Sequence, residues 1–197
     1  IRPYLIGDGG DIEFIKYEDS KVYVKLTGAC AGCSLIDVTL KEGIEESYPS
    51  NLPASEIQEY ISLKKAESYD ISDDEILLTA DTIVVLRDEV MGKPINAQDA
   101  FDKLRKLSAN THQVITGCCI KTVDNIKHFS VVTDVTFRYL SDEEIQYYVD
   151  NYKPFDKAGA YGIQEWIVYI GVTSINGSYF NVMGLPVQRI YDTLKNL

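Results

Sequence analysis

The sequence has little basic charge, no long apolar run and few cysteines. It contains 19 Lys and Arg residues against 30 Asp and Glu among 197 residues, so the formal net charge is −11. Basic surfaces provide much of the affinity for nucleic acids and anionic membranes, so this balance argues against both partners. No stretch approaches the ~18 apolar residues of a membrane span, and no charged-then-apolar leader opens the chain. A cytoplasmic protein is therefore expected.

Four cysteines are too few to suggest a disulfide framework, and they form two different pairs. Cys118 and Cys119 are adjacent within an apolar run. Neighbouring strand residues point to opposite faces, so this pair is expected to lie in the core without binding one metal jointly.

Cys30 and Cys33 form a Cys-Ala-Gly-Cys loop just before Ser34, which is expected to cap a helix carrying Ile36 and further apolar residues at helical spacing. The N-terminus of a helix lowers the pKa of a nearby thiol and favours the thiolate. The spacing alone is consistent with a redox pair, half of a zinc site or a pair of cluster ligands.

The remaining sequence alternates between strand and helix patterns, which predicts a mixed α/β sheet. Hairpins are expected at residues 12–17 with 21–26 and at 112–123 with 126–139. Further strands are expected at 76–86, 163–170 and 178–183. Helices are expected to begin at the capping residues Ser55, Asn96 and Ser141, and a last helix at Pro186.

The predicted strand at 76–86 contains one carboxylate, Asp81, among aliphatic and β-branched residues. Burying a carboxylate in such a strand is unfavourable unless the carboxylate is paired, hydrogen-bonded or bound to a metal. A strand break near Thr79 and Ala80 would let Asp81 and Thr82 point into a cleft, and the turn at Lys93 would add a cation. This combination suits a metal-bound polyphosphate, while the alternative is a capped strand end followed by a surface turn.

Six motifs follow in order between residue 45 and the end of the chain. They are Lys65-Ala66, Asp81-Thr82, Gly92-Lys93-Pro94 and the blocks at 107–117, 156–164 and 177–186. Together they resemble the Maf-type nucleoside triphosphate pyrophosphatases, which are related in fold to inosine triphosphatases. The Asp-Thr pair and the Tyr-Gly-Ile-Gln block are the variants that accompany dTTP and UTP in that family. The resemblance implies hydrolysis of these nucleotides to the monophosphate and pyrophosphate.

The resemblance also implies roles for individual residues. Asp81 would be the catalytic carboxylate, binding magnesium or manganese or acting as a base toward water. Glu46 matches a second acidic metal position. The implied substrate-binding residues are Lys65, Lys93 and Lys157 for the triphosphate, and Thr82 and Gln164 for the pyrimidine. Taken singly, Lys65 could be a solvated helix end and Gln164 a loop-pinning amide. Glu165 stands where relatives usually have Gly.

A second group of motifs occupies residues 1–46, namely Ile1-Arg2-Pro3-Tyr4-Leu5, Asp8-Gly9-Gly10-Asp11 and the blocks at 26–33 and 39–45. They resemble the C-terminal domain of NifU-like iron–sulfur scaffold proteins. This resemblance implies a cluster on Cys30 and Cys33, completed by a second copy of the chain in a homodimer, with iron–sulfur recipient proteins as partners.

The two resemblances together predict a fusion: a partial α+β NifU-like segment at 1–45, then a Maf/inosine-triphosphatase-like mixed-sheet domain at 46–197. Maf proteins begin with a strand and a Ser-x-x-Arg-Arg loop that grips phosphate. The only arginine before Arg87 here is Arg2. The expected pyrophosphatase is therefore N-terminally truncated and weakly active, and the alternatives are an iron–sulfur scaffold or an inactive chimera of the two.

Overall fold

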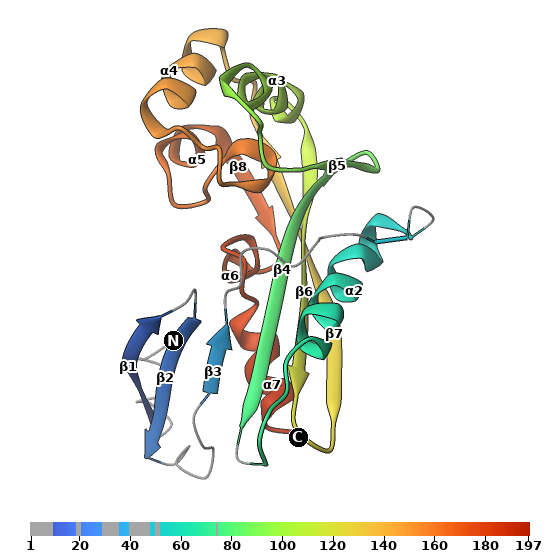
Figure 1. The fold of residues 1–197 in the computed structure, drawn as a ribbon. Helices are drawn as coiled ribbons and strands as arrows, with labels where there is room; N and C mark the ends of the chain where they lie inside the picture. The colour runs from blue at the N-terminus through green and yellow to red at the C-terminus, as the bar shows by residue number, and fades with distance from the viewer. Residues whose placement is uncertain (1–9, 19–20, 29–35, 40–47, 50–51, 74) are drawn as a thin grey trace.

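The computed structural model of the chain describes residues 10–18, 21–28, 36–39, 48–49, 52–73 and 75–197. Its strands form one mixed sheet in the order β1-β2-β3-β4-β6-β7-β8, and β5 is an additional partner of β4 (Figure 1). The expected mixed α/β architecture is thus confirmed. No helix within these residues is long and apolar enough to span a bilayer.

The N-terminal part of the sheet consists of three short strands. β1 (Gly10–Glu18) and β2 (Lys21–Gly28) form the expected antiparallel hairpin. The prediction of a helix at Ile36 is wrong, because residues Ile36–Thr39 form the strand β3. Three of its four residues are β-branched, which favours a strand over a helix. β3 pairs with β2 on one side and runs parallel to β4 on the other, so the sheet continues across the predicted boundary at residue 45.

Three long strands form the middle of the sheet: β4 (Ile76–Leu86), β6 (Thr111–Lys121) and β7 (Ile126–Phe137). β4 runs without interruption through Asp81, so neither a strand break near Thr79 and Ala80 nor a strand end there occurs. β6 pairs with β4 from Leu77 to Val85. On the opposite edge of β4, β3 pairs only with Ile76 and Leu77, and β5 (Glu89–Met91) pairs only from Val84 onward. Among the described residues, no strand covers positions 78–83 of this edge.

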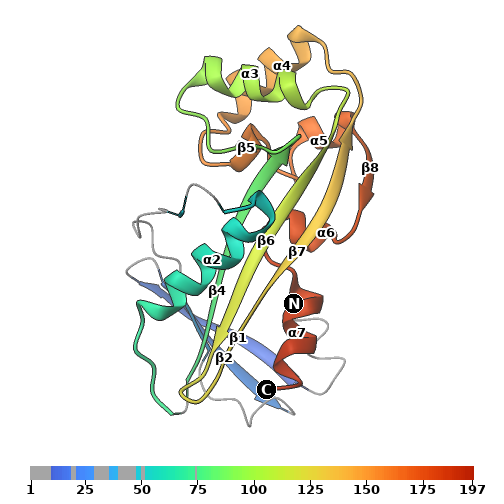
Figure 2. The ribbon, with the colours of Figure 1, turned by 90° about the vertical axis from the view of Figure 1, so that its right-hand side faces the viewer.

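Helix α2 (Ala54–Glu67) covers one face of the three long strands, and α7 (Val187–Leu194) lies on the other (Figure 2). Ile57 and Ile61 of α2 pack against Ile83 and Ile115, as their helical spacing predicts. The capping box expected at Ser55 is wrong, because the helix begins at Ala54 after Pro53 and no side chain caps it. Helix α7 follows Pro186 as expected.

Cys118 and Cys119 lie on opposite faces of β6 and are both fully buried. Burial raises the pKa of the Cys118 thiol to about 12 and that of Cys119 to about 11. Both thiols therefore remain protonated near neutral pH, and the prediction that they are core residues is confirmed.

The close contact between α2 and β6 depends on Gly117. A Cβ at this position would lie 2.1 Å from the backbone carbonyl of Gln58. Gly117→Ala must therefore displace α2, and we expect a loss of about 1–3 kcal/mol or more of unfolding free energy in urea titrations. Gly92→Ala is the matched control, since nothing lies within 4 Å of its Cβ position. Equal stability of both variants would contradict this close packing.

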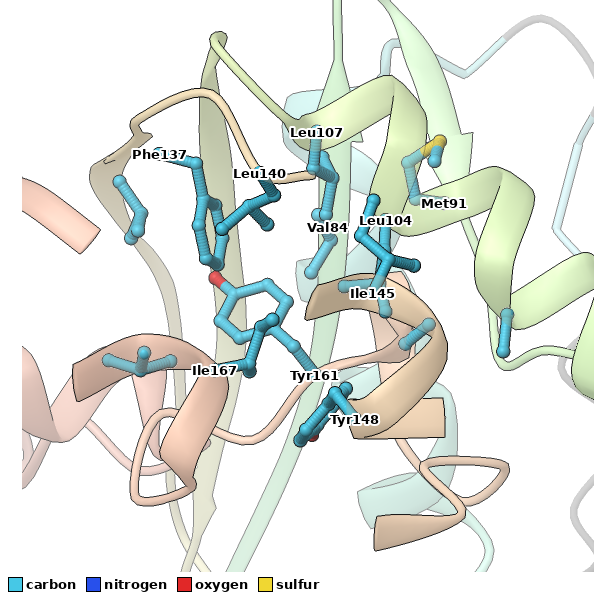
Figure 3. Packing of buried hydrophobic residues seen from close by; sticks show 14 of the residues in the cluster. Val84, Met91, Leu104, Leu107, Phe137, Leu140, Ile145, Tyr148, Tyr161 and Ile167 are labelled. Carbon is cyan, nitrogen blue, oxygen red and sulfur yellow. The ribbon is translucent and has the colours of Figure 1, made fainter. Parts of the chain in front are cut away.

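At one end of the sheet, α3 (Ala97–Leu107), α4 (Asp142–Tyr152), η1 (Ala158–Ala160) and α5 (Trp166–Gly171) enclose the largest buried cluster (Figure 3). The predicted caps are confirmed: Asn96 accepts from the Asp99 amide, and Ser141 and Glu144 form a capping box. The strands expected at 163–170 and 178–183 are wrong, because these segments hold α5 and α6 (Tyr179–Val182), with β8 (Val172–Asn176) between them.

Candidate active site

A cavity of about 400 Å³ lies beside the middle of β4 and brings together five of the predicted site residues. Successive strand residues point to opposite faces, yet both Asp81 and Thr82 line this cavity. The uncovered edge of β4 explains this arrangement, since side chains from both faces can reach the space beside it. The predicted residues along the cavity wall are Asp81, Thr82, Lys93, Lys157 and Gln164.

Asp81 is paired with a further predicted site residue, Lys65. The Lys65 Nζ lies 3.0 Å from Asp81 Oδ1, and the two side chains are only 16% and 21% exposed. Lys65 belongs to the last turn of α2, which the packing of Ile57 and Ile61 holds against the same face of the sheet. Lys65 is therefore not a solvated helix end, and it supports a negative charge on Asp81.

Thr82 points to the opposite face, where its hydroxyl contacts a buried polar network. Its Oγ1 lies 2.8 Å from Thr116 Oγ1, and Thr116 donates to the carbonyl of Asn181 at 3.1 Å. Gly184 lies next to Thr82 in the cavity wall, where its φ of +101° favours glycine. The loop after α6 is thereby held close to the Thr82 hydroxyl.

Lys157 lies between two carboxylates that the sequence analysis did not assign. Its Nζ is 2.8 Å from Asp156 Oδ1 and 3.2 Å from Glu165 Oε1. Burial lowers the pKa of Lys157, but its hydrogen bonds to Asp156 and Glu165 outweigh burial and raise the pKa overall. The ammonium therefore stays charged inside the cavity.

Glu165 is itself held by Tyr148, whose hydroxyl donates to Glu165 Oε2 and accepts the Gly162 amide at 3.2 Å. Burial and the bond to Glu165 raise the pKa of Tyr148, so the phenol keeps its proton. A Cβ at Gly162 would lie 2.8 Å from Glu165 Cδ and 3.0 Å from Lys157 Cε. The absence of a side chain at Gly162 thus permits the close pairing of Lys157 with Glu165.

The buried side chain of Tyr161 anchors the loop that carries Lys157 and Gln164. Its hydroxyl hydrogen-bonds to His112 Nε2 at 2.7 Å. The Tyr161 ring packs edge-on against Phe137 (Figure 3), and the His112 ring stacks on the same Phe137 ring. Burial also raises the pKa of Tyr161. The Tyr169 hydroxyl donates to the Gln164 carbonyl at 2.6 Å, so the backbone of Gln164 is pinned while its side chain lines the cavity.

His112 gives the fold a pH dependence. Burial lowers its pKa from 6.5 to about 4, although the charge of Asp134 opposes this shift. Below pH 6.5 the unfolded chain binds a proton that the folded chain does not, so stability falls as the pH approaches 4. Between about pH 7 and about pH 4.5 the unfolding free energy should fall by about 2–3 kcal/mol more in the wild type than in His112→Gln.

Urea titrations at both pH values measure this difference. The glutamine amide of the variant can still hydrogen-bond to the Tyr161 hydroxyl, so the comparison isolates the titration of the imidazole. If acid lowered the unfolding free energy equally in the two proteins, the pKa of His112 would be the same in the folded and the unfolded chain.

Within the part of the chain that the structure describes, no three His, Cys, Asp or Glu side chains are grouped so that they could hold a metal ion. Glu46, Cys30 and Cys33 lie outside the described residues. Sequence reasoning missed Tyr148, Asp156, Glu165 and Thr116. Two signals were available in the sequence: the unusual glutamate after Gln164, and the position of Asp156 and Thr116 inside the family motifs at 156–164 and 107–117.

The comparisons with known proteins agree on one family. The family model described as "Maf-like protein" matches residues 28–197. The dTTP/UTP pyrophosphatase of Phocaeicola vulgatus is 60% identical over 163 residues, covering 82% of this chain and 84% of the relative. The protein of the same name from Parabacteroides distasonis is 56% identical over 162 residues, covering 81% and 84%. The family match includes Cys30 and Cys33, so the iron–sulfur alternative has no support beyond the resemblance of residues 1–46.

Proposed function

The chain belongs to the Maf-like protein family, and from this premise we propose that it hydrolyses dTTP and UTP to the nucleoside monophosphate and pyrophosphate in the cavity around Asp81. The observation that carries this proposal is the convergence of Asp81, three lysines, Thr82 and Gln164, which come from separate parts of the sequence. The names of relatives at up to 60% identity support the choice of substrate.

In the proposed reaction a water oxygen attacks the α-phosphorus. The new P–O bond forms as the bond to the bridging oxygen of the β-phosphate breaks, and pyrophosphate leaves with the electron pair. Asp81 receives the proton of the attacking water or orients that water, since a carboxylate paired with a lysine remains ionised. Lys93 and Lys157 stabilise the charge that develops on the phosphate oxygens.

The chemistry of the site fits a magnesium or manganese ion that arrives with the triphosphate. Magnesium in such sites is held by one or two carboxylates together with phosphate oxygens and water. Asp81 meets this requirement, and Glu46 is the second candidate from the sequence. When bound, the ion would supply charge stabilisation at the α-phosphate.

Lysines carry the positive charge in this proposal. Arg2 is the only arginine before Arg87 in the sequence, so the phosphate-gripping Ser-x-x-Arg-Arg pattern is absent from it. Each charge-assisted contact is worth about 1.5–3 kcal/mol, so a site with fewer of them should turn over more slowly. We therefore propose a lower rate than that of relatives that carry this pattern.

A nucleotide panel tests the proposal. Pyrophosphate release from dTTP, UTP, dCTP, dATP and dGTP is measured with Mg²⁺ or Mn²⁺, and the nucleoside monophosphate is identified as the other product. The expected result is preferential turnover of dTTP and UTP. Release of inorganic phosphate instead of pyrophosphate, or equal rates with all five nucleotides, would overturn it.

A further inference from the structure

We infer that Thr116 is a positioning residue that fixes the hydroxyl hydrogen of Thr82, so that Thr82 offers only lone pairs to the cavity and selects a base with a ring N–H donor. The inference rests on the proposed function and deepens it. Thymine and uracil carry such a donor at N3, whereas cytosine has an acceptor there. Thr116 is fully buried and does not line the cavity, so it acts through Thr82.

The direction of the hydrogen bonds follows from the number of hydrogens available. A threonine hydroxyl has one hydrogen and two lone pairs. The backbone carbonyl of Asn181 can only accept, so Thr116 must donate its single hydrogen to it at 3.1 Å. In the 2.8 Å contact between the two threonine hydroxyls, Thr82 is then the donor. Its hydrogen is directed away from the ligand, and only acceptor capacity remains on the cavity side.

The Asn181 carbonyl cannot turn away from Thr116, because Asn181 is held at several points. Its Nδ2 donates to the Val114 carbonyl at 3.1 Å and to Thr133 Oγ1 at 3.0 Å. Its backbone amide donates to Ser178 Oγ at 3.3 Å. Asn181, Thr116 and Thr133 are all fully buried, so the hydroxyl of Thr116 has no solvent-facing alternative.

The resulting polarity distinguishes two bases of the same size. The imide N3–H of thymine or uracil can donate a hydrogen bond to Thr82 Oγ1. The N3 of cytosine is an acceptor and would face the Thr82 lone pair without a hydrogen between them. An unmatched buried polar group of this kind corresponds to roughly a tenfold or greater loss of kcat/KM. The best competitor is 5-methyl-dCTP, because it keeps the 5-methyl group of dTTP and changes only the donors and acceptors of the ring edge.

The test compares kcat/KM for dTTP and 5-methyl-dCTP in the wild type and in Thr116→Val. The wild type should favour dTTP by roughly tenfold or more. Valine removes the acceptor for the Thr82 hydrogen, so the Thr82 hydroxyl can rotate and donate to cytosine. The dTTP preference should then fall by at least about threefold, mainly through faster turnover of 5-methyl-dCTP. The Asn181 carbonyl still accepts the Gly184 amide at 2.9 Å, which limits the structural cost of the substitution.

Two further variants separate this role from a general effect on packing. Thr79 of β4 also has a buried hydroxyl, which donates to the Ser62 carbonyl at 2.6 Å. Thr79→Val removes this hydroxyl and should keep the wild-type ratio of kcat/KM for dTTP and 5-methyl-dCTP. Thr116→Ser keeps the hydroxyl and should also keep the ratio. If the valine variant does not fold, Thr116→Ala provides the same comparison.

The outcomes separate this inference from the proposed function. An unchanged dTTP preference in a folded Thr116→Val protein, or no preference in the wild type, would overturn the role of Thr116. A wild type without pyrophosphate release would overturn the proposed function instead. In that case, calorimetric binding of dTMP and 5-methyl-dCMP to the same variants tests the direction of the Thr82 hydrogen without turnover.

Discussion

Replacement of Asp81 by Asn should lower kcat for dTTP by about 10²- to 10⁴-fold, the range expected when a positioned general base is removed. The amide cannot accept the proton of the attacking water and is a poorer ligand for a divalent cation. It still offers an oxygen to Lys65, which lies 3.0 Å from the carboxylate, so the fold should be retained. Single-turnover pyrophosphate release measures the loss, and circular dichroism checks the fold.

Asp124→Asn is the matched control for this prediction. Asp124 is an exposed residue of the turn between β6 and β7 and carries the same chemical change. Its rate should equal that of the wild type. A folded Asp81→Asn protein with more than about a tenth of the wild-type rate would exclude Asp81 as the catalytic carboxylate.

The elements that sequence reasoning predicted well are those with a local signal. Asn96 and Ser141 each satisfy an orphan amide within three residues, so the helix starts behind them can be recognised without knowledge of the fold. The β6–β7 hairpin has long β-rich arms and a polar turn, and the structure confirms it.

The failures concern short apolar segments whose conformation is decided by their neighbours in space. Residues 163–170 have a run of apolar side chains that fits a strand or a helix equally well, and α5 buries Ile167 and Val168 in the main cluster. At Ile36 the helical spacing was misleading because β2 and β4 offer pairing partners on both sides. Neither set of neighbours is visible in the local sequence.

In the candidate site, too, some features could be predicted from the sequence and others could not. The motif resemblance placed Asp81, Thr82, Lys93, Lys157 and Gln164 in one site, and the structure brings them to one cavity. The partners that control the charge of Lys157 were missed, because their pairing is decided by side-chain geometry, even where the partner is the adjacent Asp156, and by contacts between separate segments. Tyr148 reaches Glu165 from α4, for example, across 17 positions of sequence.

The pairing of Lys157 with Glu165 leads to the second large effect. Lys157→Ala removes a cation from the phosphate site and also leaves the carboxylates of Asp156 and Glu165 without it. Both losses oppose the binding of a triphosphate. We therefore expect kcat/KM for dTTP to fall by about 100-fold, and by less in Lys93→Ala.

A double-mutant cycle separates the lost attraction from the new repulsion. Adding Glu165→Gln to Lys157→Ala removes one uncompensated carboxylate while leaving an acceptor for the Tyr148 hydroxyl. The double variant should regain at least about threefold in kcat/KM over Lys157→Ala, and this gain should shrink as salt screens the charges. Glu165→Gln alone should change kcat/KM far less, because Lys157 still pairs with Asp156. If the two substitutions were simply additive, Glu165 would not control the charge that Lys157 presents to the phosphates.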